Sequence, residues 1–449
     1  MPQPDLASPA NPGHFPRRHS RGQRRHRADI RSPGPRRRPA PHCRRRILTT
    51  PTGSIFDWTK EQFHLPLGMI YLDGNSLGPL PKATPARIQK MLTEEWGEHL
   101  ITGWNACSWM EMPTRLGDRI GRLIGAETGH TVVGDTLSIK VFQALAAAVA
   151  LNPGRKVILS DTGNFPSDLY MAEGLIELLG EDYELRLAEP HRLEEEITEE
   201  VAVLLVTEVD YRTGRRHDVA ALTAKAHEMG ALAIWDLAHS AGAVPVDVAG
   251  GKADFAVGCT YKYLNAGPGA PAFIYVAPRH AEHAEPALSG WLGHDTPFAF
   301  ERSYRPAPGI ERMRVGTPPV IQMAALDAAL DVWDRLDMAE VRKRSLALTG
   351  LMIEEVETHC PGLKLATPRD TDLRGSQVSF RFEHGYAAMQ ALIDQGVIGD
   401  FRAPDIMRFG ITPLYIGEDE VREAVEILAR ILRGALWDQP KYQQRKRVT

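Results

Sequence analysis

The sequence predicts an α/β fold in which a large, mainly parallel sheet carries helices on both faces. Short apolar strands alternate with helical segments between about residue 131 and residue 276. Strands separated by helices form parallel βαβ units with right-handed crossovers. The continuous apolar run Val201–Val206 is typical of a strand that is buried on both faces of such a sheet. Ligands of these sheets bind beyond the carboxyl ends of the strands, so we expect the functional residues there.

The expected elements follow in a regular order from a start near Ile55. Two helices come first, over 82–96 and 112–124. Strands of the large sheet are expected over 131–133, 156–159, 201–206, 231–235, 253–257 and 273–276, with helices over 138–151, 169–179 and 219–229. One long helix is expected from about residue 321 to residue 357, then a strand over 377–382 and helices over 386–395 and 418–432. This last group predicts a smaller α/β domain.

The chain of 449 residues is long enough for two or three domains. We expect an extension over 1–48, an N-terminal segment over 49–80, a large domain over 81–320, a small C-terminal domain over 321–437 and a tail over 438–449. Residues 1–46 hold 13 arginines and no lysine against Asp5 and Asp29, a balance of +11. This proline-rich segment cannot bury a core and is expected to be disordered. A transit peptide and a basic arm for nucleic acid are alternatives to the non-functional extension that we favour.

The composition excludes several classes of protein. The remainder of the chain is acidic, which gives no reason to expect nucleic-acid binding. No apolar stretch is long enough to span a bilayer, so no membrane association is expected. The four cysteines are scattered, without a CxxC pair or the spacing of metal ligands. This pattern favours a reducing compartment, so we expect a cytoplasmic protein with no disulfide framework and no metal site.

Lys262 is the most informative residue of the chain. It lies in the segment GCTYKYLNAGPG, residues 258–269, directly after a short apolar run. Upstream, the apolar run AIWD ends at Asp236, and His239 follows three residues later. A lysine after one strand and an aspartate at the end of another can hold pyridoxal phosphate (PLP). The lysine amine forms a Schiff base and the aspartate pairs with the pyridinium nitrogen. His239 has the alternative of being an ordinary polar group at a strand end.

Two further segments can bind a phosphorylated cofactor. The segment GDTLS, residues 134–138, lies between a strand and a helix, where backbone amides and hydroxyls bind phosphate. Its alternative is a simple helix N-cap by Thr136 or Ser138. The segment NFPSD, residues 164–168, follows another strand. There Phe165 can stack on a pyridine ring and Asp168 can meet polar groups of the cofactor. The alternative for this segment is a proline-containing turn with a helix cap.

Six segments of this chain occur in the same order in the kynureninase family. They are YLDGNSLGPLP at 71–81, FPSD at 165–168, DLAH at 236–239, YKYLN at 261–265, GWLGH at 290–294 and GTPP at 316–319. From about residue 55 to residue 435 the chain therefore resembles this family. Its members are homodimeric fold-type-I PLP enzymes, related to class V aminotransferases. They hydrolyse the Cβ–Cγ bond of L-kynurenine, giving anthranilate and L-alanine in tryptophan catabolism.

The resemblance implies a fold-type-I PLP-transferase with a mainly parallel seven-stranded sheet and a smaller C-terminal α/β domain. It also implies PLP as cofactor, a small-molecule substrate and a homodimer with shared active sites. The implied catalytic residues are Lys262, which binds the cofactor, and Tyr261. The other implied cofactor contacts are Leu137 and Ser138 at the phosphate with Tyr261, Phe165 stacked on the ring, Asp236 at its nitrogen, Asp168, Thr207 and His239 beside it, and Trp291 and Thr317 from the partner subunit.

Two further positions are implied to bind the substrate. Arg408 would hold the α-carboxylate as a bidentate fork, and Trp104 would meet the aromatic ring. Some members of the family have asparagine at the position of Thr317 and histidine at the position of Trp104. The choice between L-kynurenine and 3-hydroxy-L-kynurenine therefore stays open, and we expect L-kynurenine.

Two rival functions share the cofactor. A cysteine desulfurase needs a nucleophilic cysteine in the smaller domain, and Cys360 in the segment THCPG lies in that half of the chain. The alternative for Cys360 is a small residue that fills a helix-to-strand turn. Trp291 and the GTPP segment fit kynureninase better. The second rival is a PLP-binding protein without catalysis, and the intact Lys262, Asp236 and Arg408 count against it.

Overall fold

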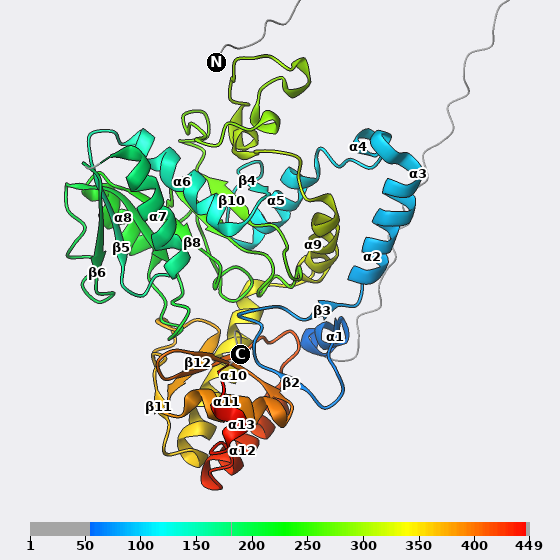
Figure 1. Ribbon diagram of the computed structural model, residues 1–449, viewed down its shortest axis with the longest axis vertical. Helices are drawn as coiled ribbons and strands as arrows, with labels where there is room; N and C mark the ends of the chain where they lie inside the picture. Colours follow the sequence, from blue (N-terminus) through cyan, green and yellow to red (C-terminus); the bar gives the residue numbers. More distant parts are fainter. Residues whose placement is uncertain (1–53, 181, 446–449) are drawn as a thin grey trace, which may run out of the picture. The chain divides into compact units, whose positions relative to one another are not determined.

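The computed structural model describes residues 54–180 and 182–445 (Figure 1). The arginine-rich extension expected over 1–48 and the last four residues of the expected tail lie outside the described residues. The boundaries expected between the parts of the chain stay predictions.

The centre of the structure is a seven-stranded sheet with the order β4-β10-β9-β8-β7-β5-β6. Strands β5 to β9 run parallel, and β10 is antiparallel to both of its neighbours, β4 and β9. The predicted α/β fold with a mainly parallel seven-stranded sheet is thereby confirmed. The strands are β4 Thr131–Val133, β5 Val157–Asp161, β6 Glu184–Ala188, β7 Val201–Thr207, β8 Leu232–Asp236, β9 Phe255–Gly258 and β10 Phe273–Val276.

Both faces of this sheet are covered by helices, as the continuous apolar strands predict. Neighbouring residues of one strand belong to different cores: Leu204 of β7 packs in one core and Leu205 in the other. Helices α6 and α7 pack over the face of Leu205, whereas α5, α8 and α9 pack over the face of Leu204. These helices span α5 Met112–Leu123, α6 Leu137–Leu151, α7 Pro166–Leu179, α8 Val219–Glu228 and α9 Val320–Trp333.

The smaller C-terminal α/β domain is built on a four-stranded antiparallel sheet with the order β11-β12-β15-β14. Its strands are β11 Lys364–Leu365, β12 Gln377–Arg381, β14 Asp400–Arg402 and β15 Ile406–Gly410. Its helices are α10 Met338–His359, α11 Gly385–Asp394, α12 Glu418–Arg433 and α13 Pro440–Gln443. Figure 1 draws these elements in yellow to red, against green and cyan for the large sheet.

Three expectations about single elements were wrong. The long helix expected over 321–357 is two helices, α9 and α10, because the side chain of Asp337 accepts the amide of Ala339 and starts a new helix. The helix expected over 82–96 is α-helical only over α2 Thr84–Lys90 and continues as a π-helix over Met91–Trp96. Strand β6 was not expected, because its edge position leaves polar residues in it exposed.

A segment near the start of the described chain joins distant parts of the fold. Strand β2 Ile70–Tyr71 pairs in parallel with β13 Val397–Ile398, and β1 Phe63–His64 pairs with β3 Leu80–Pro81. The amide of Gly78 donates to the carbonyl of Tyr261, 2.8 Å away. Short helices α1 Ile55–Glu61, α3 Gly97–His99 and α4 Gly103–Ala106 complete this part. None of the helices in the described part of the chain is both long and apolar enough to cross a membrane.

Candidate functional site

The carboxyl ends of β8 and β9 bring Lys262 and His239 together. The Lys262 Nζ atom lies 3.0 Å from Nε2 of His239, and both side chains are buried. Burial, reinforced by the positive charge of Lys262, holds the pKa of His239 well below its usual range. A neutral imidazole can accept a hydrogen bond from the lysine amine. Lys262 is therefore held in place by a neutral partner.

Two buried acids lie beside this lysine. Asp236 ends β8, and Asp168 lies in the first turn of α7. Burial raises the pKa of both carboxyls, and for Asp168 the charge of Asp236 raises it further. The Asp236 Oδ1 atom accepts the amide of Ala238 at 2.8 Å, whereas Oδ2 of Asp168 has no hydrogen-bond donor among the described residues. Two facing acids with one lysine are suited to a group that brings a positive charge.

Phe165 forms one wall of the site. It precedes α7, its side chain is 39% exposed, and its ring packs edge-on against Tyr211 with 5.1 Å between centroids. The Lys262 Nζ atom lies 5.8 Å from the centre of the Phe165 ring. Asn164 fixes this arrangement, because its Oδ1 accepts both the Phe165 amide and the Thr207 hydroxyl. The positioning role of Asn164 was missed, although it stands in the NFPSD segment.

The start of α6 lines a cavity of about 340 Å³. Thr136 and Leu137 line it from the helix, and Tyr261 and Cys259 line it from the lysine loop. Thr136 is the N-cap residue of α6, as one alternative expected, but its side chain makes no capping hydrogen bond. The Ser138 hydroxyl lies 2.9 Å from that of Ser167, which links this turn to the FPSD segment. The arrangement offers the amides and hydroxyls that a phosphate needs.

Lys140, a buried lysine that was not predicted from the sequence, stabilises this turn. Lys140 Nζ donates to Asp135 Oδ2 at 3.1 Å, to Gln143 Oε1 at 2.9 Å and to the Met313 carbonyl at 3.1 Å. Asp135 has φ 56°, in the left-handed region that a non-glycine residue rarely adopts. Lys140 therefore satisfies the side chain of the strained residue that begins the turn. No sequence pattern separates such a lysine from a surface one.

Arg408 lies on β15, and its guanidinium is fully buried. Its Nε donates to Asp400 Oδ1 at 2.7 Å, and its Nη2 pairs with Asp400 Oδ2 and with the Ser76 hydroxyl at 2.6 Å. Its Nη1 donates to the Tyr211 carbonyl. The ring of Tyr211 in turn packs against Phe165, so Tyr211 connects Arg408 to the lysine site.

Three predicted residues lie apart from this group. Trp104 packs edge-on against Trp109, with 5.5 Å between ring centroids, and Trp291 does the same against Phe298 at 5.7 Å. Trp291 is 41% exposed, and Thr317 is exposed on the segment that follows Val315. Across the described residues, no hydrogen bond or ring contact joins these three side chains to Lys262.

The thiol proposed for a desulfurase is not available. Cys360 follows α10 and is buried in the apolar core. Burial raises the pKa of its thiol to about 11, which opposes formation of a nucleophilic thiolate. The residue fills the helix-to-strand turn, in line with the simpler expectation.

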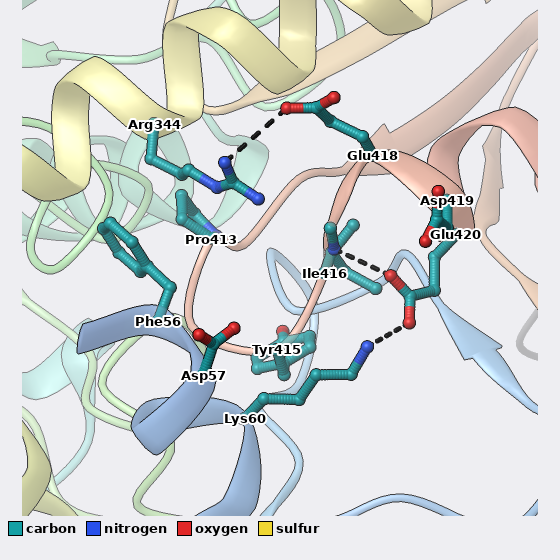
Figure 2. Close-up of a pocket in the computed structure, with 11 residues that line it drawn as sticks. Phe56, Asp57, Lys60, Arg344, Pro413, Tyr415, Ile416, Glu418, Asp419 and Glu420 are labelled. Atoms are coloured by element: carbon teal, nitrogen blue, oxygen red, sulfur yellow. Dashed lines mark hydrogen bonds and ion pairs between the residues drawn. The ribbon is translucent and has the colours of Figure 1, made fainter. Parts of the chain in front are cut away.

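A further pocket of about 340 Å³ lies between α1, α10 and α12 (Figure 2). Its charged groups pair with one another: Lys60 contacts Glu420, and Arg344 lies 3.6 Å from Glu418. The Glu420 side chain also accepts the Gly417 amide and so caps α12. None of the predicted site residues lines this pocket. Since its charged side chains pair with one another, the pocket has a structural role in holding α1, α10 and α12 together.

Comparison with known proteins agrees with this geometry. Residues 341–428 match the model of the kynureninase C-terminal domain. A kynureninase of Pseudomonas fluorescens is 52% identical over 397 residues, which cover 87% of this chain and 95% of that protein. A kynureninase of Burkholderia pseudomallei is 51% identical over the same coverage.

Solved structures support the fold. An apo cysteine desulfurase from Thermococcus onnurineus has a TM-score of 0.70 at 20% identity, covering 84% of this chain and 98% of that one. A C-DES mutant with glycine covalently linked to its PLP cofactor has a TM-score of 0.71 at 16% identity, covering 82% and 98%. With half of its residues shared over nearly the whole length of curated relatives, this chain belongs to the kynureninase family.

Proposed function

We propose that this chain is a PLP-dependent hydrolase that cleaves the Cβ–Cγ bond of L-kynurenine, giving anthranilate and L-alanine in tryptophan catabolism. The observation that carries the proposal is the buried group of Lys262, His239, Asp236 and Asp168 at the carboxyl ends of the strands. Membership of the kynureninase family supports the substrate and the reaction.

The residues fit PLP as the cofactor. The facing carboxyls of Asp168 and Asp236 leave Oδ2 of Asp168 without a donor in the described chain, and a polar group of the cofactor would supply one. The cavity at the start of α6 has the position and the hydroxyls for a phosphate. Bound PLP draws electrons away from the substrate Cα and thereby makes the bonds around it labile.

Each residue then has a defined task. Lys262 holds the cofactor and moves a proton at the substrate Cα. Tyr261 keeps its phenol proton, because burial raises the pKa of this group above its usual range, and it can deliver that proton to the departing Cβ. The remaining assignments are Asp236 at the ring nitrogen, Asp168 and His239 beside the cofactor, Phe165 as a stacking surface fixed through Thr207 and Asn164, and Leu137 and Ser138 with Tyr261 at the phosphate.

The substrate is held at both of its ends in this proposal. Arg408 binds the α-carboxylate, because a buried guanidinium is suited to that planar anion. Trp104 meets the aromatic ring. L-Kynurenine is proposed as the preferred substrate, and 3-hydroxy-L-kynurenine is the second candidate because Trp104 and Thr317 stand at positions that vary in the family.

A homodimer with shared active sites is part of the proposal. Three aromatic side chains of one segment are exposed in the single chain: Trp291 at 41%, Phe298 at 62% and Phe300 at 76%. A second copy would cover such a surface, and it would bring Trp291 and Thr317 to the site of its neighbour. A cytoplasmic location is proposed from the free cysteines Cys107, Cys259 and Cys360.

The test begins with the absorption spectrum of the purified protein after addition of PLP. L-Kynurenine is then added, and anthranilate is followed by its fluorescence. A band of lysine-bound PLP together with growing fluorescence is the expected result. A PLP band without anthranilate would move the proposal to 3-hydroxy-L-kynurenine. Absence of a PLP band would overturn the assignment of Lys262.

A further inference from the structure

The Arg408 guanidinium is hydrogen-bonded at Nε, Nη1 and Nη2 by groups from three segments. Asp400 on β14 pairs with its Nε and Nη2, Ser76 accepts from Nη2, and the carbonyl of Tyr211 accepts from Nη1. The second arginine, Arg402, also reaches Asp400, with its Nη2 2.7 Å from Oδ2. Asp400 is therefore shared by two arginines and is fully buried.

A second aspartate, Asp73, faces this group from the residues that follow β2. Its Oδ1 atom is buried and has no hydrogen-bond donor within the described part of the chain. Asp73 lies beside Asp400, so the two carboxyls repel each other when both are ionised. The charged and titratable groups that interact with Asp73 come from five elements or loops: Tyr71, Asp400, Arg402, Arg408, Tyr263 and Tyr415.

Above pH 7, where Asp73 is ionised, the charges of this cluster are balanced before any substrate binds. Arg402 and Arg408 carry two positive charges, and ionised Asp73 and Asp400 carry two negative ones. A substrate carboxylate would add an unbalanced negative charge to a buried site, which is costly. One proton taken up by a carboxyl of the cluster would restore the balance.

We propose that Asp73 takes up a proton when the α-carboxylate of the substrate binds at Arg408. The inference rests on the proposed function of Arg408. Asp400 cannot be the acceptor, since it is the direct partner of both guanidiniums. Asp73 makes no pair with either arginine and has a buried oxygen without a donor, so it gains a hydrogen bond to Asp400 when it is protonated.

The pKa shifts of Asp73 and Asp400 support the assignment of the proton to Asp73. Burial, and then the charge of Asp400, raise the pKa of Asp73 to about 7. Burial also acts on Asp400, but Arg408 outweighs it and holds the pKa of Asp400 below its usual range. Asp400 therefore stays ionised near neutral pH, and Asp73 is the group that titrates there.

Proton uptake by Asp73 makes KM rise, and not fall, with increasing pH. Below pH 7 Asp73 already carries the proton, so substrate binding needs no uptake and KM is constant. Above pH 7 each binding event must recruit a proton, so KM rises with pH, by about 25-fold between pH 6.5 and pH 8.5. The proton is taken up on binding and released with the product, so kcat does not follow the same slope.

The test is the pH profile of KM and kcat for L-kynurenine in the PLP-loaded enzyme. The wild type is compared with Asp73→Asn, which mimics the protonated carboxyl, and with Asp73→Ser in case the first variant folds poorly. The matched control is Asp405→Asn, because Asp405 pairs with Arg381 on the exposed surface of the same domain. The proposal expects a KM slope in the wild type and the control, and a flat KM near the low-pH value in the Asp73 variants.

The test distinguishes failure of the Asp73 proposal from failure of the proposed function. A pH-independent KM in a wild type that forms anthranilate would overturn the role of Asp73 alone. A KM that still rises with pH in a folded Asp73 variant would also overturn the role of Asp73. A wild type that forms no anthranilate at any pH would overturn the proposed function and this inference with it.

Discussion

The Nζ atom of Lys262 lies 3.0 Å from the Nε2 atom of His239, and both belong to loops that follow neighbouring parallel strands. The pair joins two βαβ units at the edge of the sheet where ligands bind. Since His239 is kept neutral by its burial, it fixes the direction of the lysine without competing for a proton near neutral pH. The orientation of the Lys262 side chain is therefore set by the protein itself, before a ligand binds.

In the proposed function Lys262 is both the anchor of the cofactor and the group that moves the proton, so replacing it by alanine removes both. We expect Lys262→Ala to lower kcat by about 1,000-fold or more, since nucleophilic and acid–base roles add together. Anthranilate fluorescence measures the loss. Lys343→Ala, on the exposed face of α10, is the matched control and should keep wild-type activity. Activity of Lys262→Ala within about 10-fold of the wild type would reject the assignment.

Gly78 should be intolerant of any side chain. A Cβ atom at this position would lie 2.4 Å from the carbonyl oxygen of Lys262 and 2.5 Å from Oδ1 of Asn265. Gly78→Ala is therefore expected to displace the lysine loop and to lower the occupancy of PLP, measured by absorbance after gel filtration. Gly154→Ala is the control, because a Cβ there meets nothing within 4 Å. Equal occupancy in both variants would contradict the packing argument.

Lys140 should matter for stability. Lys140→Met leaves Asp135 Oδ2 and Gln143 Oε1 without this donor, while the Met313 carbonyl keeps the Gln143 Nε2 donor at 3.2 Å. A loss of about 1–3 kcal/mol in the free energy of unfolding is expected, because buried acceptors without donors are costly. Urea unfolding followed by tryptophan fluorescence measures it. Lys343→Met, with the same substitution at an exposed site, should unfold at the wild-type urea concentration.

Asp254 should make the protein sensitive to acid. Burial acts to raise the pKa of its carboxyl, but hydrogen bonds from His227, His280 and the Ala233 amide outweigh it and hold the pKa well below the usual range. The stabilisation is present above the pKa of the unfolded state, about 3.9, and is lost as the pH falls below it.

The comparison variant for this prediction is Asp254→Asn. It should be less stable than the wild type at pH 7, by about 2–4 kcal/mol, since four hydrogen bonds to the carboxylate, including one from Arg279, are weakened. The difference between the two proteins should shrink as the pH falls from 5 to 3, as measured by urea unfolding. A constant difference across this range would contradict the role of the charge.

The part of the site that could be predicted from the sequence is the part that follows from local patterns. Asp236 ends an apolar strand and Lys262 follows another, so the parallel sheet alone places them at one edge. The break between α9 and α10 escaped prediction because it depends on one side-chain bond of Asp337, which does not disturb the apolar periodicity. Strand β6 escaped because an edge strand with exposed polar residues lacks the apolar pattern of its neighbours.

Long-range contacts make up the rest. The pairing of Asp400 with Arg408 is local to one hairpin, but its neighbours Ser76 and Asp73 come from the other end of the chain. No periodicity in a sequence reports a contact between residues 332 positions apart. Lys140 was missed for another reason: its burial depends on Met313, which is 173 positions away.

The contact between Ser76 and Arg408 also sets an order of events during synthesis. Residues 70–78 leave the ribosome early, yet their partners on β13 and β15 follow more than 320 residues later. At a translation rate of 5–20 residues per second, this interval lasts about 20–60 s. The early segment must wait for that time with its strand edge unpaired, and a chain that stops before β15 lacks Arg408, the partner of Ser76.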